Sequence, residues 1–382
     1  MAWLGVVAAA ALIGVILLDA FEAMILPRRV RHAYRLARLF YQTAWLLWKA
    51  LAQLFPAGRW RYAFLSIFGP LSLFGLMMVW AAGLITGFAL LHWSLGTAIS
   101  VPPGADVRFT TYLYFSATTF FTLGYGDLVP AGGWGRMFSV AEAGIGFGFL
   151  AVVISYLPVL YQAFSRREIT ISLLDARAGS PPSAGELLRR LADARSLAGV
   201  GPLLVEWERW SAELLESHLS FPVLRFYRSQ HDNQSWVAAL TTILDTSAFL
   251  IANAEPSDSY QARLTFAMAR HAAVDLVLVS QTPPLPPNYD RLPAADLALM
   301  RESLRAAGLA MRDEPTMANS LIELRGLYEP FVCALATQLQ FTLPPFVVEK
   351  RPVDNWQTSP GMARSPGLSD LQASGAHDEH ND

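Results

Sequence analysis

The chain has 382 residues, of which 53% are hydrophobic and 16% are charged, and its formal net charge is −2. This balance is typical of a membrane protein, and it provides no excess of positive charge for binding nucleic acid. Cys333 is the one cysteine, which excludes an intramolecular disulfide and a zinc site built on cysteines. The length is sufficient for a membrane part and a second domain.

The first apolar run, Trp3 to Leu26, is long enough to cross a bilayer. It has no basic start and no clear cleavage site, so we interpret it as a retained transmembrane helix and not as a signal peptide. Several arginines follow Pro27, and such clusters stay on the cytoplasmic side, which predicts an N-terminus outside the cell. The first predicted domain therefore comprises residues 1–27.

Two acids, Asp19 and Glu22, lie near the inner end of this predicted helix and share one face. Acids inside membrane helices are candidate functional residues, here for gating or for sensing protons. The alternative is that both acids lie at the membrane interface and pair with Arg28 or Arg29. The sequence leaves both interpretations open.

A basic segment, residues 28–61, contains the apolar and aromatic stretch Leu39 to Phe55. Basic residues flank the stretch on both sides, and a spanning helix would place one of these clusters outside, against the charge rule. We therefore predict an amphipathic helix that lies in the inner membrane interface. The alternative, a further membrane-spanning helix, stays open.

Residues 62–164 are predicted to form one membrane module. Phe64 to Trp93 is long and apolar enough for a tilted membrane helix. The segment Ser94 to Phe109 contains glycines and prolines that are typical of an external loop. Thr110 to Phe121 then predicts a short helix, and Arg136 to Phe164 predicts a second long membrane helix.

A short stretch between these two helices has glycines at alternate positions and an acid at its end. Its residues are Thr122, Leu123, Gly124, Tyr125, Gly126 and Asp127. A dehydrated K+ needs a cage of oxygen ligands, and backbone carbonyls provide one when successive residues point them at a common axis. Glycines permit the backbone conformation that this requires. The Thr122 hydroxyl would add an oxygen, Tyr125 would hold the ring open, and Asp127 would attract cations at the outer mouth.

This stretch, followed by Pro130 and then Trp134, Gly135 and Arg136, resembles the potassium channel family. The resemblance covers residues 62–164 and implies the family's pore module of outer helix, pore helix, selectivity filter and inner helix. It also implies that four copies surround one pore, that K+ passes passively as the transported ion, and that no cofactor is needed.

The resemblance further implies residues that support the filter. Tyr114 and Phe115 stand where the family has an aromatic cuff around the filter, and the Tyr114 hydroxyl is placed to donate to Asp127. Thr118 stands where some members have a glutamate behind the filter. Filter behaviour that depends on that glutamate is therefore not expected here.

Three glycines make the middle of the predicted inner helix deformable: Gly144, Gly146 and Gly148. The resemblance places the family's hinge at Gly146, and the alternative is close helix packing through small residues. The residues predicted to line the cavity, to gate it by dewetting or to bend the last turns are Phe147, Leu150, Ile154 and Pro158.

Glu142 lies one turn before these glycines and is the third candidate sensing acid. We expect it to bond to the hydroxyl of Thr118 or Thr119, or to influence ion occupancy. His92, near the outer end of the outer helix, is expected at the outer membrane interface. Its two interpretations are a pH sensor and an interfacial residue without a function.

From about Ile169 to Lys350 the composition becomes that of a soluble domain, so we predict a cytoplasmic domain at residues 165–350. Apolar residues recur there at helical spacing in about six segments: Ala184–Leu197, Pro202–Leu219, Ser235–Ala254, Ser259–Gln281, Ala294–Ala307 and Pro315–Phe341. This pattern predicts a helical bundle. Leu240 to Ala254 is apolar enough for a fourth membrane span, but it is short and contains Asp245, which favours a buried core helix. Residues 351–382 are polar and predicted to be disordered.

The second domain shows neither a βαβ pattern nor a glycine fingerprint for nucleotides. Its aromatic and basic residues could bind an anion, or could be core aromatics beside surface charges: Trp207, Trp210, His218, Arg225, Tyr227, Arg228, His231, Asp232 and Trp236. No nucleophile and base stand out as a pair, so we expect no enzyme. The sequence does not identify a regulatory ligand.

The predicted fold is therefore an all-α membrane protein: a potassium-channel pore module with an extra N-terminal transmembrane helix and a C-terminal cytoplasmic helical bundle. We expect a homotetramer in the plasma membrane, with lipids and K+ as partners and no nucleic acid. One alternative is a potassium transporter subunit, but such chains contain several degenerate filters. Others are a non-conducting or ligand-sensing membrane protein built on a channel fold, and an enzyme in the C-terminal domain.

Overall fold

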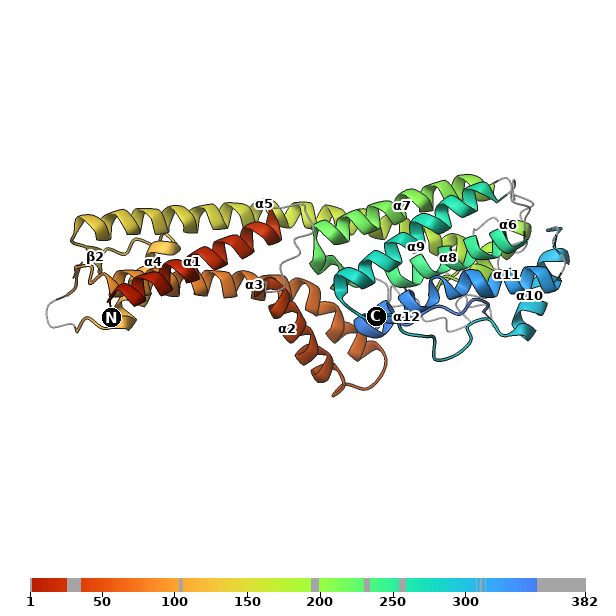
Figure 1. Cartoon of the computed structure of the whole chain (residues 1–382), viewed down its shortest axis with the longest axis horizontal. Helices are drawn as coiled ribbons and strands as arrows, with labels where there is room; N and C mark the ends of the chain where they lie inside the picture. The colour runs from red at the N-terminus through yellow and green to blue at the C-terminus, as the bar shows by residue number, and fades with distance from the viewer. Residues whose placement is uncertain are drawn as a thin grey trace, which may run out of the picture. The chain divides into compact units, whose positions relative to one another are not determined.

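A computed structural model describes residues 2–25, 36–102, 106–193, 199–229, 234–253, 259–306, 308–309, 311–312 and 314–348. These residues are almost entirely helical (Figure 1). They form two compact units, Met1–Gln162 and Ala163–Asp382. The expectations for Arg28, Arg29, His231, Asp232 and the tail at 351–382 lie outside the described residues.

The first unit contains long helices and one short β ladder. Its elements are α1 (Ala2–Met24), α2 (Leu36–Ala52), α3 (Arg59–Ser94), β1 (Ile99–Ser100), α4 (Phe109–Phe120), β2 (Val129–Pro130) and the first part of α5 (Gly133–Ala178). The two strands pair antiparallel, with Ile99 opposite Pro130. By length and composition, α1, α3 and α5 can each cross a membrane.

Small residues allow α1 and α3 to approach each other closely. A β-carbon at Gly83 would lie 2.2 Å from Cδ1 of Ile16, and one at Gly87 would lie 2.7 Å from Cγ1 of Ile13. Nearer the N-terminus of α1, Ala9 packs against Phe88 of α3 in a buried cluster. This is the way in which membrane helices commonly associate, because lipid chains provide no hydrophobic drive between helices.

Helix α2 packs on α3 through aromatic side chains. Trp48 stacks on Phe64 with ring centroids 4.4 Å apart, and its Nε1 donates to the Phe64 carbonyl at 3.1 Å. The opposite side of α2 exposes leucines, among them Leu46 and Leu47. An exposed apolar face of this kind suits a lipid environment, and the placement of α2 in the membrane interface stays a prediction.

Asp19 joins three helices of the first unit. Its side chain is buried, and its Oδ2 accepts hydrogen bonds from Nε1 of Trp80 at 2.8 Å and from the backbone N–H of Ala37 at 3.0 Å. Ala37 lies in the first turn of α2, where a carboxylate is stabilised by free N–H groups and the helix dipole. Glu22 is partly buried one turn further along α1. A sensing role for either acid stays a hypothesis.

The second unit is a helical bundle, as predicted. After the last turns of α5 it contains α6 (Ala184–Asp193), α7 (Val200–Ser220), η2 (Pro222–Phe226), α8 (Trp236–Asn253), α9 (Tyr260–Ser280), α10 (Ala294–Ala306), α11 (Glu314–Gly326) and α12 (Glu329–Leu339). Helix α8 is apolar enough to cross a membrane, but 94% of its apolar window is buried inside the protein. It is therefore the core helix that the sequence favoured.

Two predicted helix boundaries in this part of the chain are wrong. The helix expected over Pro315–Phe341 is two helices, because Pro330 lies in the first turn of α12, where a proline is tolerated, and could not lie inside one continuous helix. The inner helix, expected to end at Phe164, continues to Ala178 in α5. Ser165 to Glu168 are polar, but polarity does not end a helix, and the first glycine after this point is Gly179, which has a positive φ of 83°.

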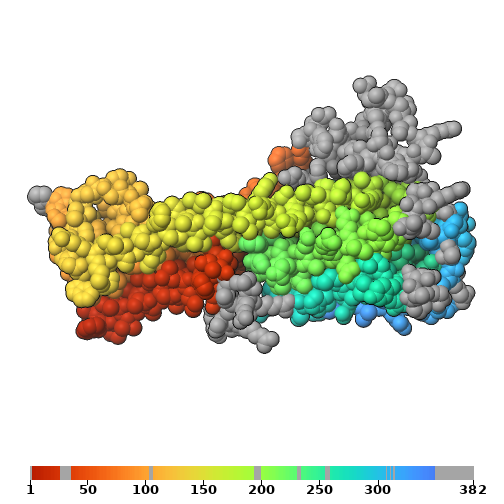
Figure 2. Space-filling view, turned by 90° about the horizontal axis from the view of Figure 1, so that it is seen from above, coloured from red at the N-terminus to blue at the C-terminus, as the bar shows by residue number. Residues whose placement is uncertain are grey.

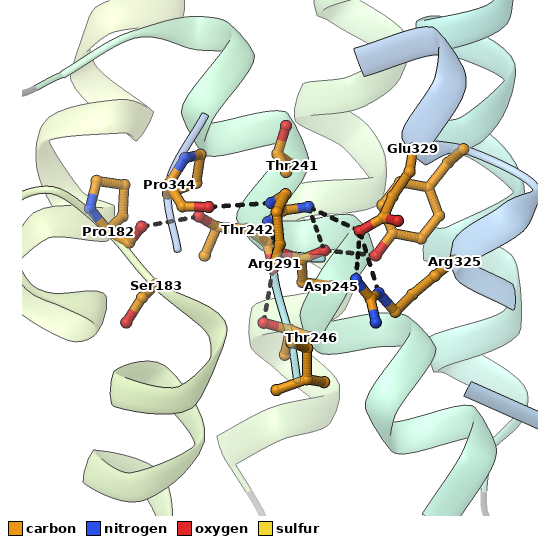
Figure 3. A network of polar contacts seen from close by, with 12 residues as sticks. Pro182, Ser183, Thr241, Thr242, Asp245, Thr246, Arg291, Arg325, Glu329 and Pro344 are labelled. Carbon is orange, nitrogen blue, oxygen red and sulfur yellow. Dashed lines mark hydrogen bonds and ion pairs between the residues drawn. The ribbon is translucent and has the colours of Figure 1, made fainter. Parts of the chain in front are cut away.

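Buried ions connect the elements around α8 (Figure 3). Arg291 forms an ion pair with Asp245, and its Nη1 also lies 3.3 Å from Oε1 of Glu329. Its Nε donates to the Pro344 carbonyl at 3.1 Å. Tyr328 donates its hydroxyl to Asp245, and burial raises the pKa of this phenol, so the proton needed for the bond stays in place. The network fixes non-helical segments to the core helix.

Candidate functional site

The filter sequence has an alternating backbone. Thr122, Gly124 and Gly126 have φ angles of 54°, 58° and 78°, whereas Leu123 and Tyr125 between them stay on the negative side. Alternation of this kind points successive carbonyls to the same side of the chain, which is the arrangement that coordinates a dehydrated cation. Thr122 is a β-branched residue in the left-handed region, a strained conformation that proteins retain mainly at functional sites.

The end of α4 holds the start of the filter. The backbone N–H of Leu123 donates to the Thr118 carbonyl at 2.8 Å, and that of Thr122 donates to the Thr119 carbonyl at 3.0 Å. The Thr118 hydroxyl donates back to the Phe115 carbonyl at 2.9 Å. The end of α4 is therefore hydrogen-bonded directly to the backbone of the predicted filter.

The outer side of the filter is tied by side-chain and backbone bonds. The Tyr114 hydroxyl donates to Oδ2 of Asp127 at 3.0 Å. Beyond Asp127, the N–H of Ala131 donates to the Ala98 carbonyl at 2.8 Å, next to the β1–β2 ladder. The loop after the filter is thus fixed to the loop after α3.

The residues predicted to line the pore lie together on an open side of the first unit. In the single chain Phe147, Leu150 and Ile154 are 69%, 55% and 63% exposed, and Tyr125 is 68% exposed. Pro158 is exposed further along α5. Figure 2 shows this part of α5, in yellow, at the surface of the chain. These side chains form an uncovered apolar face of the single chain, and their role as the wall of a cavity stays a prediction.

Gly146 lies against the end of α4. A β-carbon there would be 2.0 Å from the Phe120 carbonyl oxygen, whereas β-carbons at Gly144 and Gly148 would meet nothing within 4 Å in the chain. The geometry thus provides a reason for a glycine at 146 that concerns packing. Its role as a hinge stays a prediction.

Gly146→Ala is expected to destabilise the membrane unit by about 1–3 kcal/mol, because the added methyl group must displace backbone and not a flexible side chain. Gly148→Ala is the matched control and should leave stability unchanged or raise it, since alanine favours a helix. The measurement is the thermal unfolding midpoint of the purified protein in detergent. Equal midpoints for the two variants would contradict this account of Gly146.

A buried polar group lies behind α4. Glu142 of α5 bonds to Ser116 of α4, and not to Thr118 or Thr119 as expected. His92 of α3 is fully buried within the first unit, and its expected depth at the outer membrane interface stays a prediction. Its ring is enclosed by Phe115 and Phe138, with centroids 5.4 and 6.3 Å away. The sequence does not distinguish Ser116 as a functional residue, and its one visible signal is a hydroxyl two residues before Thr118.

The tryptophans, His218 and Arg228 of the aromatic and basic set are buried in the second unit, whereas Arg225 and Tyr227 are partly buried. Trp207, Trp210 and Trp236 are at most 3% exposed. His218 is also buried, which lowers its pKa to about 3, and its Nδ1 lies 2.8 Å from the Leu214 carbonyl. A neutral, buried histidine and buried tryptophans agree with the alternative of core aromatics.

The side chain of Arg167 is buried in this core and binds backbone carbonyls there. It is 4% exposed, and its guanidinium donates to the carbonyls of Leu224 at 3.0 Å and Tyr227 at 2.8 Å. The Arg167 carbonyl in turn accepts a hydrogen bond from Nε1 of Trp210 at 3.3 Å. The last turns of α5 are in this way held inside the helical bundle.

Comparison with known proteins agrees with these observations. A family model described as ion channel matches residues 75–162, which extend from α3 through the filter into α5. The uncharacterized membrane protein YdjJ of Bacillus subtilis (strain 168) is 25% identical over 265 residues, which are 69% of this chain and 76% of that protein. No solved structure matches the chain.

The fold and the site define an ion-channel pore domain in an all-α, multi-pass membrane protein. Residues 75–162 match the model of an ion-channel family, and this match confirms the resemblance drawn from the predicted filter sequence.

Proposed function

We propose that the chain is the subunit of a potassium-selective channel, which conducts K+ passively along its electrochemical gradient. The observation that supports this most directly is the alternating backbone at Thr122, Gly124 and Gly126, placed between two long apolar helices. Coordination by backbone carbonyls, with the Thr122 hydroxyl below them, replaces the hydration shell of the ion. No cofactor takes part.

We propose a homotetramer, because one filter strand cannot surround an ion. The uncovered apolar wall of α5 supports this assembly, since an exposed apolar surface of this size needs either lipid or another protein surface. In this arrangement the protein lies in the plasma membrane, with Asp127 at the outer mouth of the pore. The second unit lies in the cytoplasm. Helix α5 contributes residues to both units, which supports a regulatory role for the helical bundle.

The test is the reversal potential of the purified protein in a planar bilayer, with K+ on one side and Na+ on the other. We expect a reversal near the K+ equilibrium potential and, in mild detergent, a mass of four chains. Current without K+ preference would contradict selectivity. A monomeric mass and no current would favour the non-conducting alternative.

A further inference from the structure

Three helices of the first unit meet at a buried polar cluster behind the pore helix. Its members are His92 on α3, Ser116 on α4 and Glu142 on α5, and each is 0% exposed. Oε1 of Glu142 bonds to the Ser116 hydroxyl, and its Oε2 lies 3.9 Å from Nε2 of His92. Neither Oε2 nor Nε2 has a hydrogen-bond partner among the described residues. An ionisable pair in an apolar membrane unit needs an explanation.

Counting protons limits the states of this cluster. Ser116 has one hydroxyl proton but lies within bonding distance of two acceptors, the Ile85 carbonyl of α3 at 2.8 Å and Glu142. If Ser116 donates to Ile85, the Ser116–Glu142 bond needs a proton on Glu142. If Glu142 is ionised, Ser116 must donate to it, and the bond to Ile85 is lost.

The hydrogen bonds of Thr97 relate to the tautomer of the histidine. In the tautomer in which the Thr97 hydroxyl donates to the His92 carbonyl at 3.2 Å, that hydroxyl accepts a hydrogen bond from Nδ1 of His92 at 3.0 Å. In this tautomer Nδ1 holds a proton, and the neutral ring presents a lone pair at Nε2 to Glu142. His92 can accept the proton that Glu142 releases, and the resulting charges would face each other as an ion pair.

We propose that Glu142 and His92 bind one exchangeable proton, and that the position of this proton regulates the pore. With the proton on Glu142, a continuous series of hydrogen bonds joins Glu142, Ser116 and the Ile85 carbonyl and holds α5, α4 and α3 together. When the proton moves to His92 or to solvent, Ser116 turns to the carboxylate and α4 is released from α3. The inference rests on the proposed channel function and adds its regulation.

The released bond lies close to the filter. Ser116 is two residues before Thr118, and the Thr118 carbonyl accepts the N–H of Leu123 at 2.8 Å. The other titratable group joined to the cluster within the described residues is Tyr112 of α4, which donates to the Thr97 carbonyl at 2.9 Å. The α1 residues that pack nearby, Val6 and Ala9 among them, are apolar.

The direction of the pH effect follows from the apolar surroundings of Glu142. An ionised carboxylate is unfavourable inside an apolar region, so the proton stays on Glu142 at neutral pH. Rising pH removes this proton, and Ser116 then loses its hydrogen bond to the Ile85 carbonyl, which joins α4 to α3. We expect K+ current through wild-type protein in bilayers to fall at alkaline pH, and a current unaffected by alkaline pH would overturn the inference.

Two variants test the proposed roles of Glu142 and His92. Glu142→Gln can still donate to Ser116 through its amide but cannot lose a proton, so it should conduct K+ and lose the alkaline fall. His92→Phe keeps an aromatic ring between Phe115 and Phe138 and removes the second site for the shared proton. Because two sites bind one proton more tightly than either site alone, the variant should move the fall to lower pH. If Glu142→Gln does not fold, an unshifted fall in His92→Phe is the outcome that rejects the proposal.

An infrared measurement separates this inference from the channel function. The pH-difference spectrum of purified protein should contain a carboxylic acid carbonyl band that disappears at alkaline pH, is absent in Glu142→Gln and persists in Asp19→Asn. This band without K+ current would reject the channel and leave the proton site. Selective current without the band would reject the proton site and leave the channel.

Discussion

Gly124→Ala is expected to abolish K+ selectivity. Gly124 has a φ of 58°, and a β-carbon there would meet no atom within 4 Å in the chain, so the cost is conformational and not steric crowding by neighbours. A left-handed backbone costs a residue with a β-carbon about 1–2 kcal/mol. In a tetramer this cost arises four times around one ring of carbonyls. Thr122, two residues earlier, already has a left-handed backbone and its strain. The filter is therefore expected to relax and to turn its carbonyls away from the pore axis.

The measurement is the reversal potential between K+ and Na+ in planar bilayers. The matched control is Gly132→Ala, because a β-carbon at Gly132 also meets nothing within 4 Å and its φ is not positive. The control should keep the wild-type reversal potential. A selective Gly124→Ala channel would mean that the left-handed backbone at this position is not needed for coordination.

The backbone of the proposed filter could be predicted from the sequence because it depends on residues adjacent in the chain. Gly124 and Gly126 are visible as the alternate positions that need a left-handed backbone, and the structure places both there. The hydrogen bond from Tyr114 to Asp127 is also present as expected. The left-handed φ of Thr122 was not foreseen, since the propensity of a β-branched residue favours extended backbone.

The cluster behind the filter could not be found in this way. Ser116 and Glu142 are 26 residues apart, and His92 is on a third helix, so only packing brings them together. The sequence shows only that His92 is near the end of an apolar run, whereas in the fold Phe115 of α4 and Phe138 of α5 enclose its ring. Helix periodicity identified the second bundle, but it could not show that α8 is its centre and not a membrane span.

Arg291→Met is expected to destabilise the helical bundle by about 3–5 kcal/mol, the cost of leaving a buried charge without its partner. The side chains of Asp245 and Arg291 are 0% and 1% exposed, so water cannot replace the lost interaction. Arg291 also joins Glu329 and the Pro344 carbonyl, so the change frees a non-helical segment as well (Figure 3). The measurement is native-state hydrogen exchange of peptides from α8 in the intact protein.

Arg177→Met in the same unit is the matched control. Arg177 pairs with Glu206 at 3.3 Å, but the two side chains are 44% and 41% exposed, so the loss should be within about 1 kcal/mol. Similar exchange rates in the two variants would contradict the inference that a buried ion pair contributes more to stability than an exposed one.

The double variant Asp245→Leu with Arg291→Met separates the two causes of the loss. If the cost arises from the unpaired carboxylate, removal of both charges should recover part of the stability, because apolar residues that fill a buried ion-pair site are often neutral or stabilising. Recovery should be incomplete, since Tyr328 would lose the acceptor of its hydroxyl and stay buried. A double variant as unstable as the sum of the single changes would instead attribute the loss to packing around Arg291.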